Sequence, residues 1–223
     1  QNIILDQEKR KDIIVKKMNS ICEARNLKNN FSDKLIEEVV NLVEKPNIIL
    51  CKFDEIYLKI PKEILIVTMQ QHQKYFPLFD NSDNLTNLFL LVSNLKDIKG
   101  YIKIGNQRVI EARLSDAKFF WEKNKTQSLV KQVGKLKNLQ FFNQLGTFFD
   151  KTQRLRKMAG SISDQLNLSK EKIEVASSIC KADLVSDLVG EYPELQGVMG
   201  KYFAIEQGFE EDVSMAVSDH YLP

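Results

Sequence analysis

The stretch Lys181-Ala-Asp-Leu-Val-Ser-Asp-Leu-Val-Gly-Glu-Tyr-Pro-Glu-Leu-Gln-Gly-Val-Met-Gly-Lys-Tyr-Phe-Ala204 is the most informative segment of the sequence. Its apolar spacing predicts two helices that meet at the Glu-Tyr-Pro corner. Asp183 and Asp187 are four residues apart, so one helical turn would place both carboxylates near the face that should be buried. Burying a carboxylate costs free energy unless it is hydrogen-bonded or paired. The segment therefore indicates a specific fold family.

Charge is distributed unevenly along the rest of the chain. The 223 residues have a formal net charge of +2, but between Lys99 and Lys157 14 basic residues face 4 acidic ones. From Asp183 to Asp219 nine acidic residues face only Lys201. This polarity is typical of a basic surface for a polyanion beside an acidic flank. Two solvated helix faces of opposite sign explain the charges equally well.

Composition excludes several classes of protein. The hydrophobic fraction of 43% is enough for one large or two modest domains. The sequence contains no run of about 18 apolar residues, so it predicts no membrane span. The N-terminal residues have no secretory-signal pattern. Cys22, Cys51 and Cys180 are odd in number and form no C-x-x-C pair. We therefore expect free thiols in a reducing cytoplasm.

The first half mixes helical and strand-like patterns. Ser32 predicts an N-cap, with Phe31 and Ile36 at the positions of a hydrophobic staple. Pro77 lies in a strand-like segment and predicts an edge strand or a bulge. The expected elements are helices over 6–27, 33–45 and 61–70, and strands over 47–53, 74–79 and 86–93.

The second half is expected to be helical throughout. Phe148, Leu155 and Ile162 recur every seven residues, with Met158 and Leu166 in the same stripe. A polar segment without apolar periodicity places the domain boundary near residue 125. The predicted fold is therefore an α+β domain over 1–125 and an all-α domain over 126–223, mainly helical overall.

Glycines near the end of the chain predict close packing. Gly197, Gly200 and Ala204 form a small-residue strip on an expected helix. Because glycine lowers helix propensity, we expect another backbone to approach this strip closely.

The sequence predicts no catalytic residue and no metal site. Ser218-Asp219-His220 has the letters of a hydrolase triad, but neighbours in the chain cannot converge as nucleophile, base and orienting group. Two carboxylates at positions i and i+4, such as Asp183 and Asp187, can bind a hard metal ion. In HD-type phosphohydrolases a His-Asp pair does so, but here the dipeptide is Ala182-Asp183, and alanine cannot be a ligand. The sequence therefore favours a structural Asp183 that hydrogen-bonds a neighbouring helix.

Six cations are candidates for binding nucleic acid. Lys74 precedes Tyr75 and Phe76, which supply stacking surface, although core packing explains the aromatic residues equally well. For each of the six, phosphate binding and plain solubility remain equally open. The candidates are Lys74, Arg108, Arg113, Lys118, Lys151 and Arg154.

Four long blocks of the sequence resemble the β subunit of the bacterial two-subunit glycyl-tRNA synthetase. The blocks are Met69-Gln-Gln-His-Gln-Lys-Tyr-Phe-Pro77, residues 105–120, residues 145–155 and the 181–204 stretch quoted above. Residues 41–46 and 219–223 also resemble that family. Blocks of this length in the same order are more specific than any single motif.

The resemblance implies a fold, and it implies that the two subunits have different functions. Residues 1–125 would be similar to the B3/B4 region of phenylalanyl-tRNA synthetase β chains, and 126–223 would be an HD-like helical domain truncated at its C-terminus. In that family the separate α subunit activates glycine with ATP and Mg²⁺, and the β subunit engages tRNA(Gly) in an α2β2-type heteromer. The chain itself would bind tRNA, hold no cofactor and perform no bond chemistry. Asp183 would be the remnant of a degenerate HD site.

Two other functions are weighed against a tRNA-binding part of a glycine–tRNA ligase. One is a metal-dependent HD-type phosphohydrolase, which would hold a divalent metal through Asp183. The other is a scaffold that only assembles subunits.

Overall fold

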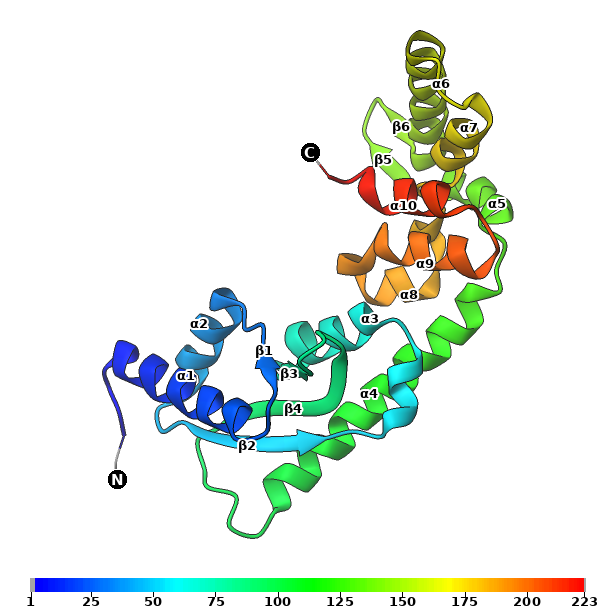
Figure 1. The fold of residues 1–223 in the computed structure, drawn as a ribbon. Helices are drawn as coiled ribbons and strands as arrows, with labels where there is room; N and C mark the ends of the chain where they lie inside the picture. Colours follow the sequence, from blue (N-terminus) through cyan, green and yellow to red (C-terminus); the bar gives the residue numbers. More distant parts are fainter. Residues whose placement is uncertain (1–2, 223) are drawn as a thin grey trace. The chain divides into compact units, whose positions relative to one another are not determined.

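The computed structural model describes residues 3–222, which divide into two units between Lys118 and Phe119. Helices dominate both units, and the first also contains a four-stranded antiparallel sheet (Figure 1). The mainly helical composition and the mixed first half are thereby confirmed. The division between the units falls inside a long helix, α4 (Tyr101–Lys125).

The first unit alternates helices and strands up to α4. Its elements are α1 (Gln7–Glu23), β1 (Lys28–Asn29), α2 (Asp33–Leu42), β2 (Asn47–Lys52), the 3₁₀ turn η1 (Glu55–Lys59), α3 (Lys62–Val67), the π-helical turn η2 (Thr68–His72), β3 (Phe76–Phe79), β4 (Leu85–Ser93) and most of α4.

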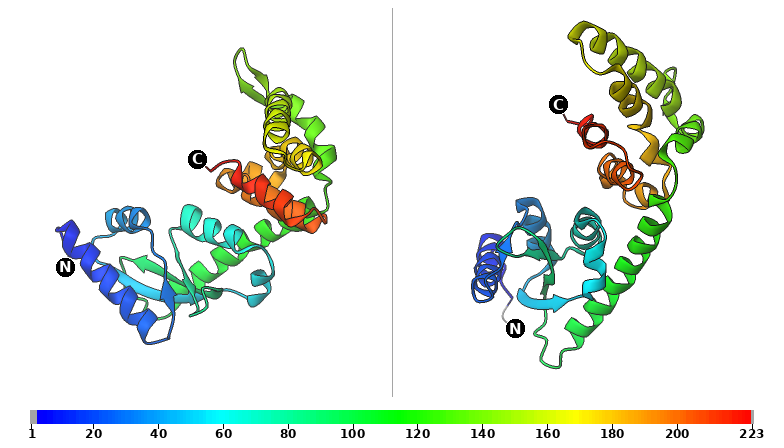
Figure 2. Two further views of the ribbon diagram at one scale, coloured as in Figure 1. Left: turned by 45° about the horizontal axis from the view of Figure 1, so that its top comes forward. Right: turned by 45° about the vertical axis from the view of Figure 1, so that its right-hand side comes forward.

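The sheet of the first unit has the strand order β1-β3-β4-β2 and is covered on both faces. On one face Met18 of α1, Val39 of α2 and Leu90 of β4 belong to a single buried cluster. On the other face α4 is tied to the sheet, because the Lys52 N–H of β2 donates to Gln107 Oε1 at 3.2 Å. Figure 2 shows α1 and α2 on one side of the strands and α4 on the other.

Local signals fixed several boundaries of these elements. Ser32 caps α2 by accepting a hydrogen bond from the Leu35 N–H at 3.4 Å, as predicted. The helix ends at Leu42, three residues earlier than expected. The predicted irregularity at Pro77 is confirmed, since the β3–β4 register shifts between Pro77 and Phe79.

The second unit contains the end of α4, further helices and a short hairpin. Its other elements are α5 (Leu129–Gln132), η3 (Val133–Asn138), β5 (Gln140–Phe142), β6 (Gly146–Thr147), α6 (Phe148–Leu166), α7 (Lys170–Ile179), η4 (Ala182–Val185), α8 (Asp187–Glu191), η5 (Pro193–Leu195), α9 (Val198–Glu206) and α10 (Glu211–Asp219). Strands β5 and β6 pair antiparallel, so the prediction of an all-α second half was wrong at these residues. Strands of three and two residues are too short to show a period.

The stretch 181–204 forms four short elements in place of two helices. Ser186 has extended backbone angles, and its hydroxyl accepts from the Val189 N–H at 3.1 Å to cap α8. Because this extended residue interrupts the helix, Asp183 and Asp187 lie on different elements, η4 and α8. The predicted shared turn was therefore wrong, although Pro193 begins a new turn at the corner, as expected.

The structure modifies the expectations for the small-residue strip at 197–204 and for the apolar stripe of α6. Gly197 precedes α9 with a φ of +80° and so is not part of the helix. A Cβ at Gly200 would lie 2.7 Å from Val217 Cγ1, so the predicted close approach occurs there, through a side chain of α10. The apolar stripe of α6 is exposed from Met158 to Leu166, where these two side chains are 63% and 62% accessible.

The core of the second unit includes the aromatic end of α4. The ring of Trp121 stacks on that of Phe203 with centroids 5.6 Å apart. Among the described residues, no helix is long and apolar enough to cross a membrane. The three cysteines are free and buried.

Candidate nucleic-acid interface

Most of the charge at the start of the second unit is positive. Between Lys131 and Lys157 seven basic residues face one acid, Asp150. Within the described part of the chain, Arg156 is the one member of these seven with an ion pair, to Glu174 at 3.8 Å. The other six cations form no ion pair among the described residues, so this region has an excess of positive charge.

The single acid of this region is used by the fold. Thr147 and Asp150 form a reciprocal capping box at the start of α6, with Asp150 Oδ2 accepting from the Thr147 N–H at 2.8 Å. These hydrogen bonds lower the pKa of Asp150, and Arg154 and Lys137 lower it further. Gly146, with a φ of +81°, makes room for the carboxylate, because a Cβ there would collide with it. The acid therefore orders the helix start.

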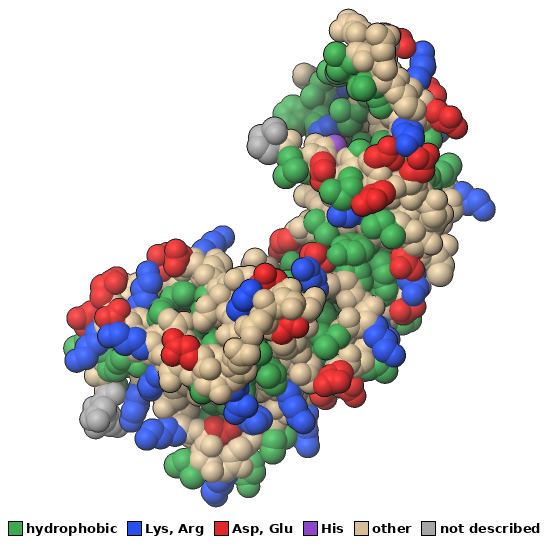
Figure 3. Space-filling view, in the orientation of Figure 1, with side chains coloured by type: hydrophobic (Ala, Val, Ile, Leu, Met, Phe, Trp, Pro, Cys, Tyr) green, Lys and Arg blue, Asp and Glu red, His purple; other side chains and the backbone are tan. Residues whose placement is uncertain are grey.

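Aromatic rings lie among the cations of this region. Lys151 Nζ lies 4.0 Å from the ring centroid of Phe141, and Lys137 Nζ lies 4.8 Å from that of Phe149. These separations are within the range of cation–π attraction. The side chain of Phe142, at the end of β5, is 63% exposed. Figure 3 shows hydrophobic side chains gathered at the β5–β6 hairpin and the adjoining part of α6.

Lys151 and Arg154 are therefore the two predicted candidates that the structure places on this basic, aromatic surface. They lie three residues apart on the first turns of α6, where Arg154 is exposed and Lys151 is partly buried. Lys137 and the Phe141–Phe142 pair belong to the same surface but were missed as site residues. The signal that could have identified the aromatic pair is its position directly beside the turn-forming residues of 143–146.

Arg108, Arg113 and Lys118 lie on α4 in the first unit. The buried stripe of this helix contains Ile110 and Leu114, and the arginines are exposed outside it. Spacings of five residues spread the three cations around the helix, as the sequence indicated. No ion pair involves any of the three among the residues that the structure describes.

Lys74 has a different environment. Its backbone has a φ of +56°, and its Nζ lies 2.6 Å from Glu38 Oε2 on α2. The hydrogen bond to Lys74 is the largest cause of the lowered pKa of the Glu38 carboxyl. The charge of Lys74 is therefore compensated within the first unit, which distinguishes it from the other five candidates.

Asp183 is 1% exposed and joins η4 to α9. Its Oδ2 accepts from the Gly197 N–H at 2.5 Å and from the Gly200 N–H at 3.2 Å. Burial raises the pKa of Asp183 to about 6, against the lowering effect of the two amides. The carboxylate thus caps the start of α9 from a separate segment, which agrees with a structural role.

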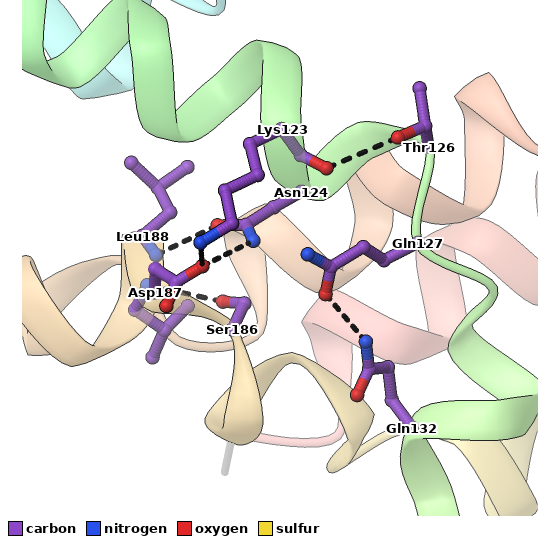
Figure 4. A network of polar contacts seen from close by, with 9 residues as sticks. Lys123, Asn124, Thr126, Gln127, Gln132, Ser186, Asp187 and Leu188 are labelled. Carbon is purple, nitrogen blue, oxygen red and sulfur yellow. Dashed lines mark hydrogen bonds and ion pairs between the residues drawn. The ribbon is translucent and has the colours of Figure 1, made fainter.

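Asp187 belongs to a polar network between α4 and α8 (Figure 4). Its Oδ2 lies 2.8 Å from Lys123 Nζ and accepts from Asn124 Nδ2 at 3.1 Å. The buried Asn124 also accepts from the Leu188 N–H at 2.9 Å. Lys123, and then Asn124, lower the pKa of Asp187. Both carboxylates of the quoted stretch therefore have protein partners, and no cluster of three or more His, Cys, Asp or Glu that could bind a metal occurs among residues 3–222.

Comparison with known proteins identifies the family. The family model described as "Glycyl-tRNA synthetase beta subunit" matches residues 1–223. The chain is 44% identical over 223 residues to the glycine–tRNA ligase beta subunit of Thermodesulfovibrio yellowstonii, covering 99% of this chain and 33% of that protein. It is 40% identical to the beta subunits of Rickettsia felis, over 100% of this chain and 33% of that protein, and of a Janthinobacterium species, over 97% and 31%.

These relatives are subunits of aminoacyl-tRNA ligases by name. The chain belongs to the glycyl-tRNA synthetase beta subunit family. It spans about a third of the length of the curated relatives it matches.

Proposed function

We propose that the chain is a tRNA-binding part of the β subunit of a heteromeric glycine–tRNA ligase. It would position tRNA(Gly) for ATP-dependent formation of glycyl-tRNA in the cytoplasm. A separate α subunit would activate glycine with ATP and Mg²⁺. The beta-subunit names of the relatives support this assignment, and so does the match of the family model to residues 1–223.

The single observation that carries the proposal is the excess of positive charge at the start of α6, where seven basic residues face one acid over 131–157. RNA presents closely spaced phosphates, and each cation that neutralises one releases a condensed counterion, which favours binding. Lys151 and Arg154 form no ion pair within the described residues, and Asp150, the one acid nearby, is held in the helix cap. A surface of this kind attracts RNA without any bond chemistry of its own.

The residues of the chain would therefore bind and orient. Lys137, Lys151 and Arg154 would contact phosphates from one side of the second unit. Arg108, Arg113 and Lys118 would add contacts from α4 in the first unit, whereas Lys74 would first have to leave Glu38. Breaking that half-exposed pair costs little, because exposed ion pairs contribute about 0–1 kcal/mol.

Charge reversal tests the proposal in the full-length β subunit together with its α subunit. Lys151→Glu combined with Arg154→Glu should weaken tRNA binding in filter assays and make the salt dependence shallower. Losing two phosphate contacts should reduce the slope of log affinity against log salt by about 1.5. The matched control is Lys9→Glu with Lys16→Glu on α1, two exposed lysines without ion pairs among the described residues, which gives the same change in net charge.

Equal affinity for the α6 variant and the wild type across several salt concentrations would reject the role of these two residues. The same assay with and without the α subunit separates RNA binding from scaffolding. A scaffold would leave the β subunit alone without affinity for tRNA, whereas a tRNA-binding part retains measurable, salt-dependent affinity.

A further inference from the structure

The hairpin β5–β6 presents an ordered tip with exposed apolar side chains. Phe142 is 63% exposed and Leu145 is 51% exposed. The turn that carries them is closed by a hydrogen bond from the Leu145 N–H to the Phe142 carbonyl at 3.0 Å. Gln140 Nε2 donates across the hairpin to the carbonyls of Phe142 and Gly146, at 3.0 and 3.1 Å. The exposed ring is therefore held by a defined turn, which projects beyond the neighbouring helices of its unit (Figure 2).

The cations beside this tip are also held in place. Phe141 packs edge-on against Phe148 with centroids 5.3 Å apart, and Lys151 Nζ lies over the Phe141 ring. Lys137 Nζ, from the 3₁₀ turn η3, lies over the ring of Phe149 on α6. Attraction to the ring faces limits the freedom of both ammonium groups, so less conformational entropy is lost when they bind an anion.

The positive charge of this surface and its exposed aromatic ring together indicate the kind of ligand that it binds. Seven basic residues and one acid, which is locked in the helix cap, call for an anionic ligand. An exposed aromatic ring adds a flat apolar face, and unpaired nucleotides supply both phosphates and flat bases. A base-paired helix keeps its bases stacked inside, where Phe142 cannot reach their faces. An acidic peptide supplies charge but not a series of flat rings.

We propose that the hairpin β5–β6 and the start of α6 bind an unpaired segment of RNA, with a base stacked on Phe142 and phosphates held by Lys137, Lys151 and Arg154. The inference rests on the proposed RNA-binding function and deepens it by naming the surface and the single-stranded character of the RNA it takes. The ring acts through stacking, so it tolerates different bases, while the cations set the dependence on salt.

The test uses the full-length polypeptide and two fluorescently tagged probes, a 12-nucleotide oligouridylate and a 12-base-pair RNA duplex. Phe142→Ala should weaken oligouridylate binding about 5-fold to 100-fold, the range for losing one stacked base, and leave duplex binding within about twofold. Leu145→Ala is the matched control, because it removes an exposed apolar side chain from the same turn. It should leave both affinities unchanged.

Phe142→Trp adds a direct signal of stacking. The indole should restore oligouridylate binding, and its fluorescence should be quenched by the probe. Trp121, the one tryptophan of the 223-residue sequence, is 4% exposed and stacked on Phe203, so the signal is the difference in emission between Phe142→Trp and the wild type. Quenching confined to the new residue supports contact between ring and base.

Two outcomes would overturn the inference. If Phe142→Ala binds oligouridylate within twofold of wild type, no base stacks on Phe142. If Phe142→Ala and Leu145→Ala lose equal affinity for both probes, the loss reflects a general effect on the hairpin. If reversal of Lys151 and Arg154 still weakens tRNA binding in either case, only this inference fails. If Phe142 governs oligouridylate binding while that charge reversal leaves tRNA binding unchanged, the proposed function fails instead.

Discussion

The carboxylate of Asp183 and the backbone N–H of Gly197 are joined by a 2.5 Å hydrogen bond that links η4 to the start of α9. The two residues are 14 positions apart, and the same oxygen also accepts from Gly200. With a φ of +80°, Gly197 turns its amide toward the acid in a conformation that other residues rarely adopt.

Substitutions at Asp183 should separate its hydrogen bonds from its charge. Asp183→Ala leaves two buried N–H groups without an acceptor and should lower the free energy of unfolding by about 2–5 kcal/mol. Asp183→Asn keeps an acceptor oxygen and removes a buried charge, so it should cost at most about 1 kcal/mol. Urea denaturation monitored by circular dichroism measures both. Equal losses for the two variants would show that the negative charge itself is required.

The pH dependence of stability should change in a defined direction in Asp183→Asn. Burial raises the pKa of Asp183 to about 6 from an ordinary 3.8, so between these values the folded state holds more protons than the unfolded state. This group's contribution to stability is therefore full below about pH 4 and is lost as the pH rises through 6, by about 3 kcal/mol. The variant should gain stability relative to wild type over that window. A difference between the two proteins that is independent of pH from 4 to 7 would contradict the buried ionisable state.

The contribution of His220 to the free energy of unfolding should change with pH in the opposite direction. Burial, together with Lys181 and Lys151, lowers the pKa of His220 to about 4 from an ordinary 6.5. The unfolded state then binds more protons between pH 4 and 6.5, so this group's destabilising contribution disappears as the pH rises through that window. His220→Asn should be more stable than wild type at pH 4.5 and similar to it at pH 7.5. Thermal unfolding at the two pH values measures the difference, and an advantage that grows with pH would be inconsistent with a neutral, half-buried imidazole.

Asn124 should matter more than Lys123, although both contact Asp187. Asn124 is 2% exposed and uses its amide for two hydrogen bonds, so Asn124→Ala should cost about 2–3 kcal/mol. The side chain of Lys123 is 48% exposed, and Lys123→Ala should cost less than about 1 kcal/mol. Denaturation of the two variants in the same buffer provides the comparison. A larger loss for Lys123→Ala would mean that the ion pair, and not the amide, holds α4 to α8.

Gly200 and Gly160 form a matched pair for glycine-to-alanine substitution inside helices. A Cβ at Gly200 would lie 2.7 Å from Val217 Cγ1 and 3.2 Å from the Asp183 carboxylate, so Gly200→Ala should destabilise by about 1–3 kcal/mol. Gly160 on α6 has nothing within 4 Å of the added atom. Gly160→Ala should therefore stabilise by about 0.5–1 kcal/mol through helix propensity. Differential scanning calorimetry should show shifts of opposite sign, and shifts of the same sign would contradict the packing of α9 on α10.

Elements whose signals are local could be predicted from the sequence. The cap at Ser32 lies within three residues of the group it satisfies, and the β-branched run of β2 is read without tertiary context. Pro77 disturbs its strand because it lacks an N–H, which is a property of the residue itself.

Features that depend on distant partners could not be predicted. The break at Ser186 is fixed partly by Asn124, which binds the amide of Leu188 from 64 residues away. The pairing of Lys74 with Glu38 likewise depends on the tertiary fold. The β5–β6 hairpin has too few residues for a period, so its exposed Phe142 was not recognised. Charge counting located the basic region but could not distinguish compensated cations from uncompensated ones.

Protection of lysines from chemical modification in the intact two-subunit enzyme tests the central claim most directly. Acetylation followed by mass spectrometry, with and without tRNA, should show Lys137 and Lys151 becoming strongly protected when tRNA is bound. Lys9 and Lys16 on α1 should react equally in both samples. If Lys137 and Lys151 remain fully reactive while tRNA is bound, the basic surface at the start of α6 does not hold tRNA.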